Sequence, residues 1–106
     1  MDSILQGTTP TLEVVIDTDD FLVENVTAAE LAIKYNGKTT IHGLQDLTVS
    51  VQNNSFSYKF QEAETLALAP EKEMRYQMRF KFGDGSIVGT EQIVLKVADL
   101  ISEEPL

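Results

Sequence analysis

The chain has 106 residues, the usual size of a single domain, which leaves no room for two domains with separate cores. It contains 17 acidic and 8 basic residues, and the formal charge of −9 opposes binding to nucleic-acid phosphate or to an anionic membrane surface. Because cysteine is absent, disulfides, thiolate nucleophiles and iron–sulfur clusters are excluded.

The first residues of the chain lack the features of a secretion signal. Residues 1–6 have neither a cationic start nor a long apolar stretch. No apolar run approaches the roughly 18 residues that span a membrane. We therefore expect a protein that is made in the cytoplasm, with neither nucleic acid nor membrane among its partners.

The first half of the chain predicts strands and one well-defined hairpin. Apolar residues alternate over residues 11–16, and again over residues 30–35. Asn36-Gly37 follows directly, and both residue types tolerate the positive φ of a type I′ turn, so residues 38–42 should return antiparallel to residues 30–35.

The second half continues the period of two. Residues 47–51 and 56–60 predict a second hairpin, and residues 61–68 favour one helical turn before a proline. Residues 74–82 give five consecutive apolar positions at every second residue, and residues 87–97 resume the pattern with a glycine that permits a break.

These elements predict an all-β fold, an antiparallel immunoglobulin-like β-sandwich of about seven strands with at most one short helical turn. We expect an extended N-terminal arm at residues 1–10, the sandwich at residues 11–98 and an acidic C-terminal tail at residues 99–106. If Lys34 and Lys59 lie on edge strands, their charges should discourage self-pairing.

The residues available for chemistry do not indicate an enzyme. His42 is the single histidine, no Gly-x-Ser-x-Gly motif accompanies it, and we expect it on the surface. The acidic residues 17–20 with Glu24 could wrap a calcium ion, but Leu22 stands where a calcium loop needs glycine. We therefore expect a solvated loop, no catalytic residue, no metal and no cofactor.

Two polar segments could instead contact another protein. A row formed by Arg75, Gln77, Arg79 and Lys81 on the strongest strand could bind an acidic partner, or could pair with carboxylates of a neighbouring strand, which we favour. Pro10 biases the preceding residues 6–9 towards an extended conformation, so this arm could add itself to a sheet edge.

Residues 6–11 read QGTTPT, and this opening before an alternating strand resembles small structural proteins of tailed phages and prophages of Gram-positive bacteria. It is similar to the N-terminal domain of baseplate upper proteins. The resemblance continues at residues 29–38, 64–66, 77–85 and 93–100. Residues 17–26 are unusually acidic for this group. The resemblance implies a β-sandwich that builds a virion, made in a bacterial cytoplasm and then incorporated into the particle.

The sequence therefore predicts a non-enzymatic virion structural protein, a tail or baseplate assembly module that acts through protein–protein contacts. Its partners would be other phage structural proteins or further copies of itself. The expected partner-binding residues are Gln6, Gly7, Thr8, Thr9, Pro10 and Thr11 in the arm, and Leu100, Ile101 and Leu106 in the tail. The alternative is a cell-surface adhesion or carbohydrate-binding β-sandwich module.

Overall fold

A computed structural model of the chain describes residues 3–16, 20–69, 72–98, 100–101 and 104–106. The strands are β1 (Ser3–Leu5), β2 (Thr11–Val15), β3 (Val26–Tyr35), β4 (Lys38–Gly43), β5 (Thr48–Ser50), β6 (Ser55–Lys59), β7 (Glu73–Phe82), β8 (Ile87–Gly89) and β9 (Ile93–Ala98). The short helical segments are η1 (Val23–Asn25), η2 (Leu44–Asp46) and α1 (Glu62–Leu66).

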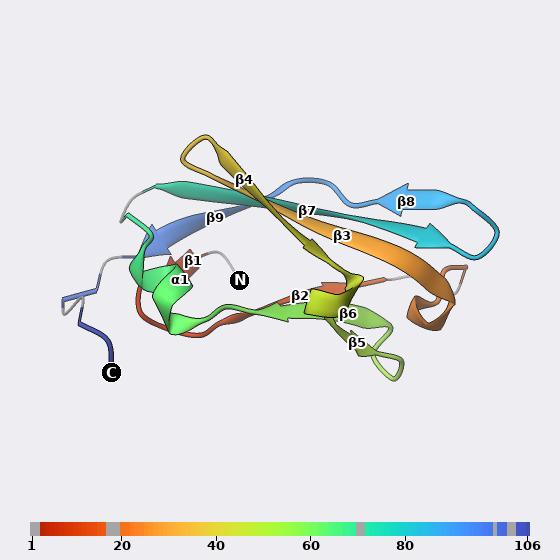
Figure 1. The fold of residues 1–106 in the computed structure, drawn as a ribbon, viewed down its shortest axis with the longest axis horizontal. Helices are drawn as coiled ribbons and strands as arrows, with labels where there is room; N and C mark the ends of the chain where they lie inside the picture. Colours follow the sequence, from red (N-terminus) through yellow and green to blue (C-terminus); the bar gives the residue numbers. More distant parts are fainter. Residues whose placement is uncertain (1–2, 17–19, 70–71, 99, 102–103) are drawn as a thin grey trace.

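The strands form two sheets that lie one above the other (Figure 1). The large sheet has the order β1-β9-β7-β3-β4, and β8 pairs with β7 outside this order. The small sheet has the order β2-β6-β5. The all-β sandwich predicted from the sequence is confirmed.

The hairpin between β3 and β4 forms at the predicted turn. Asn36 and Gly37 have φ angles of 51° and 78°, the positive values of a type I′ turn. Tyr35 therefore faces Lys38, and the pairing continues to Glu30 opposite Gly43. On its other side, β3 pairs antiparallel with β7 along nearly its whole length.

The core lies between the two sheets and is built from the predicted alternation. Every second residue of β7 is buried, which accounts for Met74, Tyr76, Met78, Phe80 and Phe82. The small sheet supplies Phe56, whose ring lies 5.4 Å from that of Phe80 between ring centroids. Each side chain of this size contributes about 1.5–3 kcal/mol when fully buried, so the large hydrophobic faces hold the layers together.

The expected extended arm at residues 1–10 includes a short strand that pairs with the chain's own large sheet. Ser3–Leu5 forms β1, which pairs in parallel with β9, and Ile4 is buried opposite Val97. Pairing of strands from the two ends of a chain is a tertiary contact that no local pattern reveals. The following residues cross from the large sheet to β2 in the small sheet.

Two further expectations concern the loop and any membrane segment. Asp17, Thr18 and Asp19, on which the calcium hypothesis depends, lie outside the described residues. Within the described part of the chain, no helix is long and apolar enough to cross a membrane.

Candidate interaction surfaces

Gln6 joins three segments at one end of the sandwich. Its backbone N–H donates to the Ala98 carbonyl at 3.2 Å. Its side-chain amide donates to the Leu68 carbonyl and accepts a hydrogen bond of 3.2 Å from the Leu100 N–H. Only 2% of Gln6 is exposed, so this residue, expected to touch a partner, instead holds its own domain together.

The residues after Gln6 are also bonded within the chain. Gly7 has a φ of 71°, and a Cβ there would lie 2.8 Å from Leu100 Cδ2. The Thr8 hydroxyl donates to the Leu5 carbonyl at 2.6 Å, while the Thr8 carbonyl accepts from the Thr65 hydroxyl at 2.7 Å. The main-chain bonds expected for this arm therefore exist, but they close the sandwich.

The end of the arm enters the small sheet. The Pro10 carbonyl accepts from the Phe60 N–H at 2.9 Å, and Thr11 pairs with Lys59 at the start of β2. Thr9 between them is exposed. Thr9 and Thr11 are thus the residues between Gln6 and Thr11 whose side chains are exposed.

The tail presents two apolar side chains to solvent. Leu100 is half-buried, whereas Ile101 and Leu106 are fully exposed. The Leu106 N–H donates to the Glu62 carboxylate at 2.9 Å, which places the end of the chain beside α1. Exposed apolar side chains are typical of contact surfaces when they form a contiguous apolar patch.

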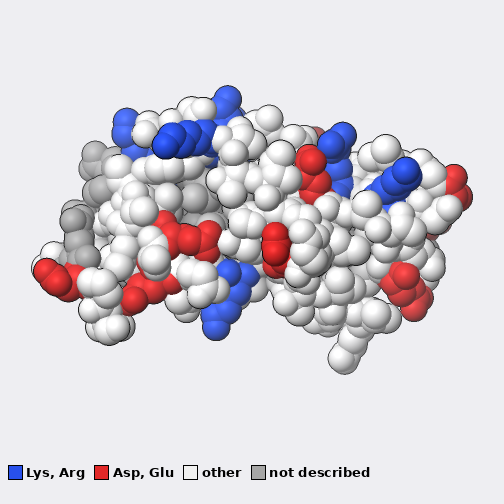
Figure 2. Space-filling model, viewed as in Figure 1, with Lys and Arg blue, Asp and Glu red and all other residues white. Residues whose placement is uncertain are grey.

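The outer face of the large sheet is cationic. Figure 2 shows most of the visible lysine and arginine along this side of the molecule. The strand register places five cations and two carboxylates on the face: Lys34, Arg75, Arg79, Lys81 and Lys96 with Glu30 and Glu73. The face therefore carries +3, and the rest of the chain carries −12 to give the total of −9. We call these seven residues the cationic face.

The expected neutralisation of the cation row is only partial. Arg79 contacts the Glu30 carboxylate at 3.2 Å, and Arg75 contacts Glu73 at 3.5 Å. Arg75 also lies directly opposite Lys34 in the register, an unfavourable like-charge pair. A hollow of about 360 Å³ lies beside this pair, and Glu73 and Gln92 also line it.

His42 is more enclosed than expected. Its ring stacks on Tyr58 with centroids 4.3 Å apart, and Nδ1 lies 3.7 Å from the Asp46 carboxylate. The Tyr58 hydroxyl donates to Glu64 at 2.7 Å, and burial together with this bond raises the pKa of Tyr58 well above its usual range. His42 therefore packs against the small sheet through the ring of Tyr58.

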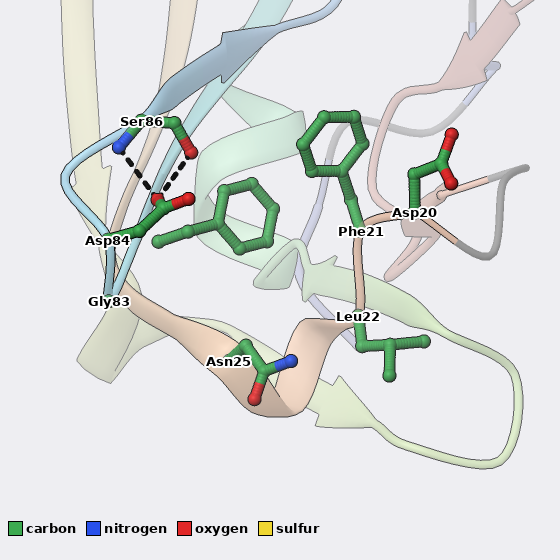
Figure 3. A pocket seen from close by; sticks show the side chains of 8 residues that line it. Asp20, Phe21, Leu22, Asn25, Gly83, Asp84 and Ser86 are labelled. Carbon is green, nitrogen blue, oxygen red and sulfur yellow. Dashed lines mark hydrogen bonds between the residues drawn. The ribbon is translucent and has the colours of Figure 1, made fainter.

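A hollow at the opposite end of the sandwich from the termini is drawn in Figure 3. The rings of Phe21 and Phe82 lie 5.1 Å apart beside it. Asp84 accepts hydrogen bonds from the N–H and hydroxyl of Ser86 at 2.9 and 2.6 Å, and these bonds lower the pKa of the Asp84 carboxyl. Asp84 and Ser86 thus bond to one another within their own turn, and we assign no ligand to this hollow.

No known protein family, curated protein or solved structure matches the chain. The surfaces described above therefore rest on the structure itself. Sequence reasoning identified the cation row but missed its continuation onto Lys34 and Lys96, because only the register shows which strands share the face. Alternation along β3 and β9 was the signal that could have suggested it.

Proposed function

We propose that this chain is a non-enzymatic structural protein of a phage or prophage virion, which serves in the tail or baseplate through protein–protein contacts. The observation that carries the contact function is the cationic face, a +3 surface on a chain of charge −9. The particle is suggested by the resemblance of residues 6–11 and the segments that follow. The protein is made in the bacterial cytoplasm and then joins the virion.

The chemistry of the cationic face favours an acidic protein as partner. Lys34 and Arg75 repel one another while they face solvent, and a partner carboxylate would bond to both. Apolar Ile41, Ile87 and Val94 are exposed on the strands of this sheet. A surface that combines arginine with exposed aliphatic side chains is typical of protein interfaces.

The carbohydrate-binding alternative needs exposed aromatic rings on which sugars stack. The chain has eight aromatic residues, five phenylalanines and three tyrosines, and of these Phe21 is half-buried. Tyr35 is half-buried and the other six are buried, namely Phe56, Tyr58, Phe60, Tyr76, Phe80 and Phe82. This burial favours the virion proposal over sugar binding.

The test is incorporation into particles in the bacterium that carries the sequence. After induction, particles are purified on a density gradient and the tagged chain is detected by immunoblot. We expect the chain to sediment with tails or whole particles, and Arg75→Glu to reduce its incorporation. Lys59→Glu makes the same charge change on the small sheet and is the matched control. A chain that stays out of purified particles would overturn the proposal.

A further inference from the structure

The outer edge of β4 is the longest edge strand of the sandwich. β4 ends the large sheet and pairs with β3 on one side only. It has six residues, and its first four side chains, from Lys38 to Ile41, are exposed. Ile41 has 59% of its surface exposed and points to the same side as the cationic face.

The free edge presents a regular set of backbone groups. The two-residue turn makes Tyr35 and Lys38 a hydrogen-bonded pair, and such pairs alternate along an antiparallel ladder. Thr40 therefore bonds to β3, whereas the N–H and C=O groups of Thr39 and Ile41 point away from it. These outward groups can bond to a further strand.

The other edges have features that oppose strand addition. β1, β5 and β8 have only three residues each, and β2 carries Glu13 in its centre. Lys34 and Lys59, expected to protect an edge, lie instead on β3 and β6, which are inner strands. β4 contains no carboxylate, although the chain is strongly acidic, and its one lysine, Lys38, lies at the end next to the turn.

We propose that β4 pairs antiparallel with β4 of a second copy of this chain, with Thr40 of each copy at the two-fold axis. This deepens the proposed function, because the assembly module would then join particles as a dimer. The outward N–H and C=O groups of one copy must face the outward groups of the other. An antiparallel pairing meets this condition when its two-fold axis passes through Thr39, Thr40 or Ile41. With Thr40 at the centre, Thr39 of each copy meets Ile41 of the other and forms four hydrogen bonds.

The structure around Gly43 selects this centre. If Ile41 lay on the axis, Gly37 in the turn of the second copy would stand opposite Gln45, in η2, where the strand has ended. If Thr39 lay on the axis, His42 would stand opposite Asn36, which belongs to the turn of the second copy and not to its strand. With Thr40 on the axis, Gly37 stands opposite Gly43, and neither residue has a side chain. A Cβ on Gly37 would have no neighbour within 4 Å, so the turn is open to such an approach.

The pairing also covers apolar surface and brings the two cationic faces side by side. Ile41 lies beside Thr39 of the second copy and loses part of its exposure. Lys38 stands opposite His42 of the second copy, whose ring already lies beside the Asp46 carboxylate of its own chain. Directly opposed residues point to the same side of a sheet, so the two cationic faces join into one surface.

A cysteine at position 40 tests the register directly, because the chain has no cysteine of its own. Thr40 meets itself as a non-hydrogen-bonded pair, with Cα atoms about 4.5 Å apart, a separation that a disulfide can span. We expect Thr40→Cys to form a covalent dimer under mild oxidation. Val15→Cys, on the exposed edge strand β2, is the matched control and should form no covalent dimer.

The unsubstituted chain is measured by light scattering after gel filtration over a range of concentrations. We expect a concentration-dependent dimer. Thr39→Pro should raise the dissociation constant of this dimer about tenfold or more, because each copy loses one outward N–H. Ile41→Lys should also weaken it and leaves the β3–β4 ladder intact, so it covers the case in which the proline variant fails to fold. Circular dichroism checks that both variants are folded.

A monomer at all concentrations, together with equal cross-linking of Thr40→Cys and Val15→Cys, would overturn the inference. Stronger cross-linking of Ile41→Cys than of Thr40→Cys would overturn the register. These measurements use the purified chain alone, whereas the proposed function is tested by incorporation into particles. Failure of one is therefore distinguishable from failure of the other.

Discussion

Replacement of Gln6 by methionine tests whether this residue joins the two ends of the chain. Methionine retains the length and most of the volume of glutamine, but it donates no hydrogen bond and accepts hydrogen bonds only weakly. In Gln6→Met, the Leu68 carbonyl and the Leu100 N–H lose their side-chain partner. The backbone bond from Gln6 to Ala98 remains, so β1 keeps its last contact with β9.

The expected loss follows from the two groups left without a partner. A buried donor or acceptor without a hydrogen bond costs about 1–3 kcal/mol. Gln6 is almost completely buried, but Leu100 is half-buried and part of its cost is relieved by water. We therefore expect Gln6→Met to lower the free energy of unfolding by about 2–4 kcal/mol, a large fraction of the 5–15 kcal/mol typical of a domain.

Urea unfolding followed by circular dichroism measures this loss as a lower midpoint with an unchanged slope. Thr9→Ala is the control, because Thr9 lies in the same arm but is exposed, and it should change stability by less than about 0.5 kcal/mol. If Gln6→Met were as stable as Thr9→Ala, Gln6 would not be the link between β1, β9 and the α1 region, and the reasoning would fail.

Three other substitutions test separate parts of the fold. Gly7→Ala should destabilise the chain by about 1–2 kcal/mol, because a positive φ disfavours a side chain and the Cβ would approach Leu100; urea unfolding measures this. Asn54→Gly keeps the positive φ but removes side-chain bonds to Val23, Ile16 and Phe21, so we expect a loss of about 2–3 kcal/mol in the same assay. The folded protein raises the pKa of Tyr58, so the neutral hydroxyl stabilises the fold fully below the unfolded-state pKa of about 10, and this stabilisation is lost as the pH rises above it. Tyr58→Phe lacks this titrating group, so its free energy of unfolding should fall less between pH 8 and 11 than that of the unsubstituted chain.

Each of these three predictions would be contradicted by a specific result. An unchanged Gly7→Ala variant would mean that the crossing to β2 is not constrained by its backbone conformation. Asn54→Gly with full stability would show that the contacts of the Asn54 side chain contribute nothing. An equal alkaline loss in Tyr58→Phe and the unsubstituted chain would assign that loss to other groups, of which Tyr76 also has a raised pKa through burial.

The strands and their turns were predictable because the features that encode them are local. The alternation in β7 is visible within ten residues, and Asn36-Gly37 specifies its turn by itself. The capping box formed by Gln61 and Glu64 stabilises the start of α1 within four residues. Such features depend on neighbouring residues only, so reading the chain in order was sufficient to predict them.

The candidate interaction surfaces depend on contacts between distant residues. The sequence indicates that residues 38–42 form a strand, but it does not indicate that β4 ends its sheet while the strand bearing Lys34 lies inside. Gln6 reads as part of a polar arm, yet it is buried because β1 pairs with β9, more than ninety positions along the chain. Hydrophobic periodicity assigns a residue to one side of a strand, whereas the order of strands is set by the packing of the whole chain. The sequence by itself therefore determined the β-sandwich and its hairpins, and only the tertiary structure decided which edges and faces are open to a partner.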